Sequence, residues 1–368
     1  MRASGRLRWP KRLGDPDLIA SQFRKWWRRR SRSVPVEAMP PVTRTEDGAM
    51  RRLGVELEFS GLSLPKLCEL VPEQVGGRAH VISDYEAEVT GTRWGKWGIE
   101  LDFAFLKALG RENNEPNVEP RNSLEELSES LLAAVARQVV PFEIVSPPIA
   151  MDELEVVDTL VSELCRAGAR GTRHSPLYAF GVHLNVELAD TTAATLLAYL
   201  QAWALLFDWL RERCHPDLSR RISPYIEPYP LDYARLILQA DYAPDSAQLI
   251  DDYLAHNPTR NRALDMLPVF AHLDEARVRA TVDDHRIKAR PALHYRLPNC
   301  QIDEPDWHWR DLWRDWLQLE HLAGDADRRA RMAKDFLSFH DSVVDRLTGD
   351  WQQQTRRWLL DDDALADH

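Results

Sequence analysis

The sequence predicts an α+β protein with a curved antiparallel sheet that is backed and flanked by helices. Between residues 50 and 190, apolar and polar residues alternate in several short segments, which is typical of strands with one buried face. After residue 190, longer segments carry apolar residues at helical spacing. We therefore expect a sheet built mainly from the first half of the chain, with helices packed on its apolar face.

The composition is that of a globular protein with a sizeable core. The chain has 368 residues, of which 44% are hydrophobic and 9% aromatic, and its net charge is −11. This negative balance argues against a nucleic-acid partner. No apolar run approaches the ~18 residues of a membrane span. No apolar stretch follows the basic N-terminus as it would in a secretory signal.

The cysteines bear on the compartment and on metal binding. The chain has four of them, far apart and without a CxxC pair: Cys68, Cys165, Cys214 and Cys300. A thiolate zinc site or a redox pair therefore has no support. So few cysteines in so long a chain favour a reducing cytoplasm as the location.

Residues 1–47 form a predicted N-terminal arm and linker. They carry twelve Lys or Arg residues against five acids, and Trp26 and Trp27 stand within a basic run. The stretch 34–42 contains three prolines and is typical of a linker. A flexible arm explains this composition, although a basic–aromatic segment also suits an acidic partner or a membrane surface. We expect residues 1 to about 45 to be dispensable for catalysis.

The segments from residue 52 to residue 190 predict most of the sheet. Apolar residues alternate with polar or small ones over 52–61, and a helix is expected over 64–71. A capping box of Ser123 and Glu126 begins an amphipathic helix over 123–139. The remaining expected elements are strands over 78–91 and 96–107, a loop over 111–122, a strand over 141–149, a helix over 151–169 ending near Gly168, and a strand over 177–188.

Helices dominate the rest of the chain. Residues 191–214 are strongly apolar and predict a core helix, whereas 279–299 return to a strand pattern. A helix over 307–323 places Trp309, Trp313 and Trp316 at i, i+4 and i+7. A packed helix face explains that spacing better than a platform for stacking bases. Residues 48–325 then form the main domain, and 326–368 form a C-terminal helix with an acidic tail.

Polar residues recur on one face of five expected strands. Glu56 and Glu58 stand at i and i+2 between the small residues Gly54 and Ser60, so their Cβ atoms would lie roughly 7 Å apart. Like charges this close cost stability unless water or a cation intervenes. The other members of this face are Glu100, Asp102, Glu143, His183, Asn185, Arg290, His294 and Arg296.

Three interpretations of this face are open. Some of the strand faces are simply solvated, or two carboxylates hydrolyse glycosides, or the residues bind a hard cation. Glycoside hydrolysis needs two acids, whereas this face carries five acids together with histidine and arginine. Carboxylates with an occasional imidazole suit Mg²⁺ or Mn²⁺, and nearby arginines suit metal-bound nucleotide phosphates. The chain has no GxxxxGK[ST] loop, so metals and arginines would hold a nucleotide. We favour the third interpretation.

Three of these segments, in this order, resemble a known family. GVELEF (54–59), EIVSPP (143–148) and GVHLNVE (181–187) resemble the putative amidoligase family. That family belongs to the carboxylate–amine ligase superfamily, together with glutamine synthetase and glutamate–cysteine ligase. The resemblance covers roughly residues 50 to 320. It implies that the curved sheet is of the glutamine-synthetase-like catalytic type, and that residues 48–325 are an amidoligase-like catalytic domain.

The resemblance implies a cation site of five residues. Glu56 and Glu58 match the acidic strand of the superfamily and would hold two divalent ions, Mg²⁺ or Mn²⁺. Glu143 matches an acid on a neighbouring strand, and His183 matches a Gly-x-His strand as a ligand of the second ion. His294 stands where the late strand of glutamine synthetase has an acid, and an imidazole can still ligate a metal.

The resemblance also implies roles in nucleotide binding and catalysis. Arg296 matches the late-strand arginine that would face the γ-phosphate of ATP, and Asn185 is the second expected cofactor contact. Arg290 and Asp102 join Arg296 as expected catalytic residues, Asp102 through its match to an aspartate that many amidoligases carry. Asn299 replaces an acid of the late-strand pattern and so departs from it.

The implied activity is ATP-dependent amide formation between a carboxylate and an amine, on small-molecule or peptide substrates. A carboxylate does not react with an amine at neutral pH, because its oxygen is a poor leaving group. ATP converts it to an acyl phosphate, which the amine then attacks. A phosphotransferase on the same fold remains an alternative. So does a non-catalytic homologue without full metal binding, which the departures at His294 and Asn299 favour.

Overall fold

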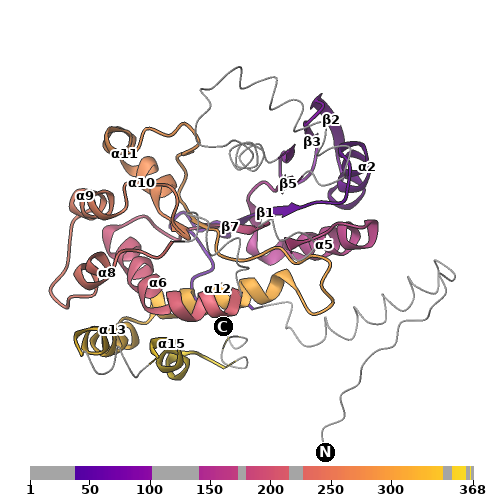
Figure 1. Ribbon diagram of the computed structural model, residues 1–368. Helices are drawn as coiled ribbons and strands as arrows, with labels where there is room; N and C mark the ends of the chain where they lie inside the picture. Colours follow the sequence, from indigo (N-terminus) through magenta and orange to yellow (C-terminus); the bar gives the residue numbers. More distant parts are fainter. Residues whose placement is uncertain are drawn as a thin grey trace, which may run out of the picture.

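The computed structural model describes residues 38–101, 141–172, 180–214, 227–342, 350–361 and 365. These residues form helices and one antiparallel sheet (Figure 1), so the predicted α+β class is confirmed. Several expectations fall outside the described residues, namely those for residues 1–37, Asp102, the loop over 111–122 and the capped helix over 123–139.

The sheet is open and runs in the order β2-β3-β4-β5-β1-β7-β9-β8, with β6 also paired to β1. Each pairing between these strands is antiparallel. Because β2 and β8 each have one neighbour, the sheet stays uncurled, and the curvature expected from the sequence is not confirmed. The strands are β1 (Arg52–Phe59), β2 (Arg78–Ser83), β3 (Glu86–Thr90), β4 (Trp97–Leu101), β5 (Phe142–Val145), β6 (Ile149–Ala150), β7 (Val182–Glu187), β8 (Leu264–Asp265) and β9 (Ala292–Tyr295).

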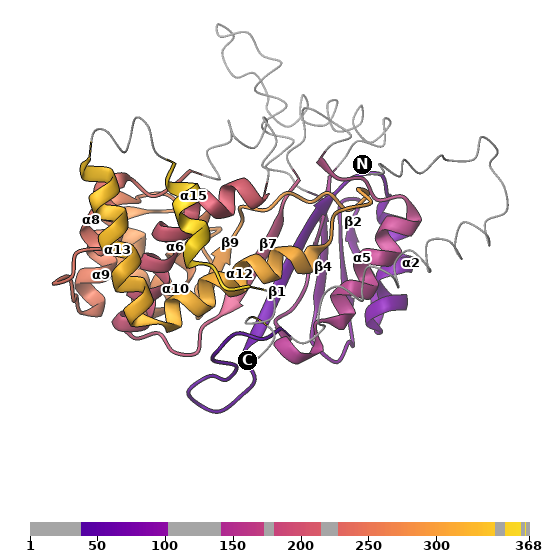
Figure 2. The same cartoon turned by 90° about the horizontal axis from the view of Figure 1, so that it is seen from below.

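Helices cover one face of the sheet, and α5 and α12 cross it in the view from below (Figure 2). Tyr295 of β9 packs there against Trp203 and Trp316, with ring centroids 5.6 and 5.2 Å away. The helices are α2 (Leu64–Val75), α5 (Glu155–Ala167), α6 (Ala193–Cys214), α8 (Leu231–Ile237), α9 (Ser246–His256), α10 (Leu267–Leu273), α11 (Glu275–Thr281), α12 (Trp309–Gly324), α13 (Ala326–Asp341) and α15 (Trp351–Thr355), with short 3₁₀ turns η1 (Met151–Glu153) and η4 (Arg356–Trp358).

Two helices confirm their predicted place in the core. Trp309, Trp313 and Trp316 of α12 are 0%, 2% and 0% exposed, which fits packing and not base stacking. The sequence analysis was wrong that no apolar run approaches the length of a membrane span, because helix α6 contains an 18-residue window, with a mean hydropathy of 1.3, that could cross a membrane by length and composition alone. However, 67% of that window is buried inside the structure, as expected of a core helix.

The structure corrects the predicted strand over 279–299. Residues 275–281 form α11, which begins where the side chain of Asp274 accepts the N–H of Arg277 at 2.9 Å. Val278 is the buried residue of this helix, so the alternation of alanine and valine with arginine reflected a short helix. Only Ala292–Tyr295 form a strand.

Other element boundaries differ by less. The predicted strand over 78–91 is a hairpin of β2 and β3, because Asp84 and Tyr85 form a turn. Helix α2 continues through Pro72 to Val75 instead of ending at residue 71. Helix α5 ends at Gly168 as predicted, and the φ of +103° at this residue favours glycine.

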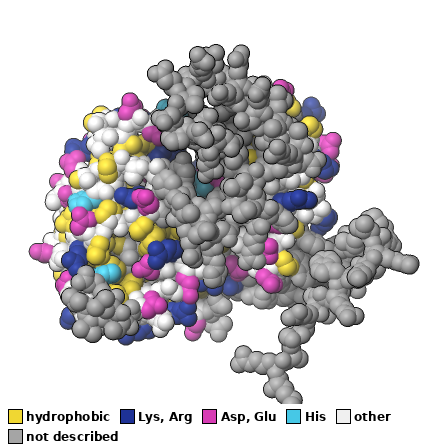
Figure 3. Space-filling view, in the orientation of Figure 1, with side chains coloured by type: hydrophobic (Ala, Val, Ile, Leu, Met, Phe, Trp, Pro, Cys, Tyr) yellow, Lys and Arg dark blue, Asp and Glu magenta, His cyan; other side chains and the backbone are white. Residues whose placement is uncertain are grey.

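Acidic and basic side chains alternate over the helical part of the molecule (Figure 3). Several of them form ion pairs, such as Arg277 with Asp251 at 2.7 Å and Arg235 with Asp341 at 2.9 Å. Exposed pairs of this kind contribute little to stability. Ion pairs that stabilise the fold appreciably are therefore expected in the interior.

The last residues before β1 are attached to the core. The carbonyl of Ala38 accepts the indole N–H of Trp313 at 3.1 Å, and the carbonyl of Val42 accepts a guanidinium N–H of Arg51 at 2.7 Å. These contacts lie within the stretch that the sequence assigned to the arm and linker. The dispensable segment should therefore end at residue 37.

We predict that deletion of residues 1–37 leaves the melting temperature and activity unchanged, because the contacts of Ala38 and Val42 remain. Deletion of residues 1–47 should lower the melting temperature, since both contacts are lost. Thermal unfolding of the two truncated proteins tests this. Loss of folded protein on the shorter deletion would contradict the assignment of residues 1–37 as an arm.

A buried ion pair joins the start of β1 to α12. Arg51 contacts both carboxylate oxygens of Glu320 at 2.9 and 3.1 Å, and the two side chains are 0% and 2% exposed. The same carboxylate accepts hydrogen bonds from Tyr199 at 2.6 Å and Trp316 at 2.9 Å. Glu320 therefore satisfies three buried donor groups at once.

We predict that Glu320→Gln lowers the free energy of unfolding by about 3–5 kcal/mol, because it leaves the charge of Arg51 buried without a counter-ion. Urea unfolding measures this loss. The control is Asp208→Asn, which breaks the exposed pair with Arg211 and should cost less than about 0.5 kcal/mol. Equal losses in both variants would show that the buried pair is not special.

Candidate metal centre on the central strands

The register of β1 brings the predicted acids and histidine together. Glu56 lies directly opposite His183 of β7, and Glu58 lies directly opposite Glu143 of β5. Directly opposite residues of antiparallel strands point to the same face of the sheet. Leu57, between the two glutamates, points the other way and is 1% exposed.

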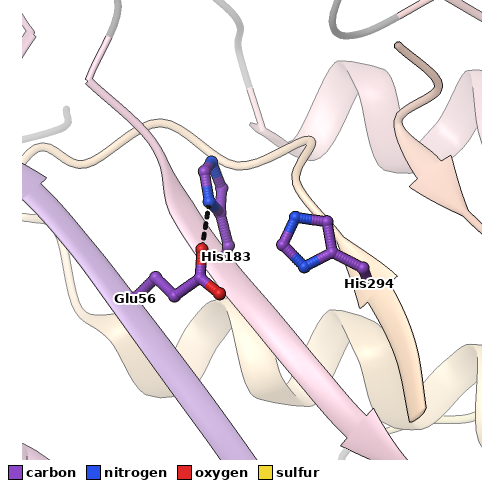
Figure 4. A group of neighbouring side chains, drawn as sticks. All are labelled: Glu56, His183 and His294. Atoms are coloured by element: carbon purple, nitrogen blue, oxygen red, sulfur yellow. Dashed lines mark hydrogen bonds and ion pairs between the residues drawn. The ribbon is translucent and has the colours of Figure 1, made fainter. Parts of the chain in front are cut away.

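His183 is the centre of this cluster. Its Nδ1 lies 2.8 Å from Glu56 Oε2 and 3.9 Å from Glu143 Oε1, and its Nε2 lies 3.4 Å from Glu58 Oε1. Figure 4 shows the imidazole reaching toward Glu56 from the neighbouring strand. The four side chains are 13–21% exposed, so they are largely shielded but still open to solvent.

Asn185 connects this cluster to β9. Its Nδ2 donates to Glu56 Oε1 at 2.7 Å, and its Oδ1 lies 2.7 Å from His294 Nδ1. Opposite Asn185 stands Gly54, where a Cβ atom would lie 3.2 Å from the Cβ of Asn185. The glycine of β1 thus leaves room for the asparagine that links the two histidine strands.

These hydrogen bonds determine the tautomer of His294. An amide oxygen can only accept, so the 2.7 Å contact to Asn185 Oδ1 places the proton on Nδ1, and it is much shorter than the 3.3 Å approach of an Arg290 N–H to the same atom. The Nε2 of a neutral His294 then carries the free lone pair. Histidine ligands of metals are commonly oriented by a hydrogen bond of this type at the other ring nitrogen.

Two overlapping groups of three residues could each hold a cation. One is Glu58, Glu143 and His183, and the other is Glu56, His183 and His294. Within each group, one ligand atom per residue lies within 4.8 Å of the others. The five residues are the predicted cation ligands, and the structure brings all of them together at His183.

The predicted arginines lie on the β9 side of the cluster. Arg290 donates to Asn185 Oδ1 at 2.5 Å, and its guanidinium lies 3.3 Å from His294 Nδ1. Arg296 pairs with Asp265 of β8 at 3.1 Å, and the two side chains are 6% and 3% exposed. Asp265 also accepts the N–H of Leu267 at 2.9 Å, which fixes its orientation.

The sequence analysis missed Asp265. Strand β8 has two residues, which is too short for an alternation to show. The available signal was an aspartate within the apolar run ALDML, since a buried carboxylate needs a partner. Asn299, the departure from the family pattern, is 2% exposed and forms a bridge with Gly181.

Comparison with known families agrees with this geometry. A family model described as "Putative amidoligase enzyme" matches residues 49–318 of the chain. The chain belongs to the putative amidoligase family. The match spans β1 to β9 and thus every cation ligand predicted from the sequence. No curated protein and no solved structure matches the chain.

Membership of the putative amidoligase family supports a ligase-type enzyme. The candidate ligands are four groups on β1, β5 and β7 together with His294 of β9. One face of the central strands within the matched range therefore carries the polar cluster, whereas their other face and the helices carry the apolar core.

The surroundings favour the charge states that a metal site requires. Burial opposes ionisation of Glu56, but His294, His183 and Asn185 outweigh it and hold the pKa of Glu56 well below its usual value. Burial, and then the charge of Arg296, hold the pKa of His294 well below its usual value, although Glu56 acts in the opposite direction. Near neutral pH the protein presents an ionised Glu56 and a neutral His294, which are the ligand forms of both groups.

We predict that Glu58→Gln weakens Mn²⁺ binding by roughly tenfold or more, while the metal-free protein melts at the same temperature or higher. The substitution removes repulsion among the carboxylates, and the amide oxygen can still accept the N–H of Gly181 that Glu58 accepts at 2.6 Å. Calorimetric Mn²⁺ titration and thermal unfolding measure the two effects.

The matched control is Glu100→Gln. Glu100 lies opposite Glu143 on the same face, but it is exposed and outside both three-residue groups. It should leave Mn²⁺ binding within about twofold, since only distant screened charge is lost. A lower melting temperature of metal-free Glu58→Gln would show that the residue is structural.

Proposed function

We propose that the chain is an ATP-dependent carboxylate–amine ligase of the glutamine-synthetase-like catalytic type, with Mg²⁺ or Mn²⁺ as its cation. The observation that carries the proposal is the meeting of Glu56, Glu58, Glu143, His183 and His294 in two three-residue groups. These residues stand on the central strands of a chain that belongs to the putative amidoligase family. The reaction would join a carboxylate and an amine of small-molecule or peptide substrates through an acyl phosphate.

The ligand chemistry fits these cations. Glu58, Glu143 and His183 offer two carboxylates and one imidazole, which suit Mg²⁺ or Mn²⁺. The second group has two imidazoles, and this nitrogen content favours Mn²⁺ over Mg²⁺. When bound, the cations would neutralise charge on the phosphoryl group of ATP as it is transferred.

Residues of β7 and residues that flank β9 would orient the reacting groups. Asn185 ties Glu56 to His294 and Arg290, so it couples the cation ligands to a guanidinium. Arg290 and Arg296 would contact the phosphates of the nucleotide, and the pair with Asp265 would hold Arg296 in place. Asp102 remains a proposed catalytic residue.

Two alternatives lead to different results in one experiment. A phosphotransferase would consume ATP without forming an amide, whereas a non-catalytic homologue would bind ATP weakly or not at all. The non-catalytic alternative is favoured by two departures from the family pattern, the imidazole of His294 and Asn299, which is buried beside Gly181. Calorimetry with ATP and Mg²⁺ or Mn²⁺, followed by assays for ADP and amide with panels of acids and amines, separates the three. Absence of ADP with every panel and of ATP binding would contradict the proposed function.

The cytoplasm is the proposed location. The four cysteines are free in the structure, two of them buried and two partly exposed. This pattern supports a reducing compartment. An acidic partner or a membrane surface for the basic residues 1–47 remains a second, independent proposal.

We predict that Arg296→Lys folds normally but loses most of its ATP turnover, because an ammonium is a point charge and cannot replace the planar fork of a guanidinium. Removal of one donor to a developing charge typically raises the barrier by about 2.7–4 kcal/mol. Steady-state ADP release measures the effect, and the melting temperature is the control, since lysine retains the charge opposite Asp265. Near-wild-type turnover would remove Arg296 from the catalytic residues.

A further inference from the structure

Arg260 lies at the bend that connects α9 to β8, the strand that pairs with the β9 strand of His294. Three residues further on, the carbonyl of Ala263 accepts the backbone N–H of Arg296 at 2.9 Å, so this segment runs along β9. The neighbouring Arg262 is held by Glu227 at 2.9 Å and by Asn257 at 2.9 Å. Arg262 thus has a structural role, which leaves the role of Arg260 to be explained.

Two arginines that act on Arg260 already have acidic partners of their own. Asp265 pairs with Arg296 at 3.1 Å, and Asp284 pairs with Arg286 at 2.6 Å. Arg260 has neither a hydrogen bond nor an ion pair with any residue in the described part of the chain, and its buried Nε has no acceptor. Its positive charge is therefore unmatched.

The electrostatics of Arg260 agree with its geometry. Burial, followed by the charges of Arg296 and Arg286, lowers the pKa of Arg260, and Asp265 and Asp284 oppose this only in part. A guanidinium remains protonated in proteins. A half-buried cation that other cations repel costs stability unless an anion offsets it.

Arg290 adds a second guanidinium without a carboxylate contact in the described residues. Its polar contacts are the carbonyl of Lys288, Asn185 Oδ1 and, at 3.3 Å, His294 Nδ1, although Glu56 attracts its charge from a distance. Arg260, Arg290 and Arg296 all act on the single carboxylate of Asp265. Arg296 contacts this buried carboxylate directly at 3.1 Å, and the charges of Arg260 and Arg290 also favour its ionised form.

We propose that Arg260, together with Arg290 and Arg296, forms an oxyanion subsite at the β8 edge of the metal centre, which takes a carboxylate or phosphoryl group. The planar fork of a guanidinium matches both groups with two parallel hydrogen bonds. In the proposed ligase, on which the identity of the natural ligand rests, that group is either a phosphate of the nucleotide or a carboxylate of the acid substrate. Binding of the anion itself requires neither metal nor catalysis.

The test is calorimetric anion titration of the full-length, metal-free protein, with inorganic phosphate and malonate as separate probes. Arg260→Met should weaken the binding of at least one probe by roughly 10-fold to 100-fold, because a hydrogen-bonded charge is lost. Arg260→Lys should restore part of that loss. Without an anion, Arg260→Met should melt at the same temperature or higher, because an uncompensated cation is removed.

The matched control is Arg277→Met on α11, an arginine that is already paired with Asp251 and Asp274. It should leave the binding of both probes unchanged. Response to phosphate alone assigns the subsite to the nucleotide, and response to malonate alone assigns it to the acid substrate.

Three results would overturn the subsite. They are no anion binding by the wild-type protein, unchanged binding by Arg260→Met, or an equal loss in the Arg277→Met control. A lower melting temperature of anion-free Arg260→Met with unchanged binding would show a structural role instead. The proposed ligase function fails separately, since it requires ADP release and the subsite does not.

Discussion

The register of β1 against β5 and β7 is the constraint on which the candidate site depends. A shift of one residue would turn Glu56 and Glu58 into the core and expose Leu57. Four buried side chains of β1 hold the register, and burial of each contributes about 1.5–3 kcal/mol. Repulsion between two carboxylates about 7 Å apart, the i, i+2 spacing of a strand, is about 2.4 kcal/mol at an effective dielectric constant of 20. The apolar face therefore outweighs the repulsion, and the acidic face is retained. The four side chains are Leu53, Val55, Leu57 and Phe59.

Hydrogen bonds from β7 and from the residue before it fix the orientations of the carboxylates of Glu56 and Glu58. His183 and Asn185 engage one oxygen each of Glu56, and the backbone N–H of Gly181 engages Glu58. His183 and Asn185 stand on one face of β7, and Gly181 immediately precedes that strand. The carboxylates are thus fixed in place before any ligand arrives, which is the condition for a preorganised site.

The sequence was sufficient for the parts of the structure that rest on local periodicity. The strands that carry Glu56, Glu143 and His183 show alternation, and α6 and α12 show helical spacing, so these elements and their faces were predicted. Strand β8 is two residues long, and the ion pair of Asp265 with Arg296 joins residues 31 apart, so no local pattern reveals either. The openness of the sheet likewise depends on how edge strands pair, which alternation does not encode.

The charges on this face are separated along the sheet. Glu100, Glu143 and Glu58 follow one another across β4, β5 and β1, whereas Arg290 and Arg296 accompany β9 beyond β7. Such an arrangement attracts cations at one side and oxyanions at the other, with His183 and Asn185 between them. A metal-bound phosphate carries both charges within one ligand, so it would offset the carboxylates and the guanidiniums together. Neither a lone cation nor a lone anion would do both, and the separation of charge is therefore a stronger argument for a metal–nucleotide ligand than the acidic residues alone.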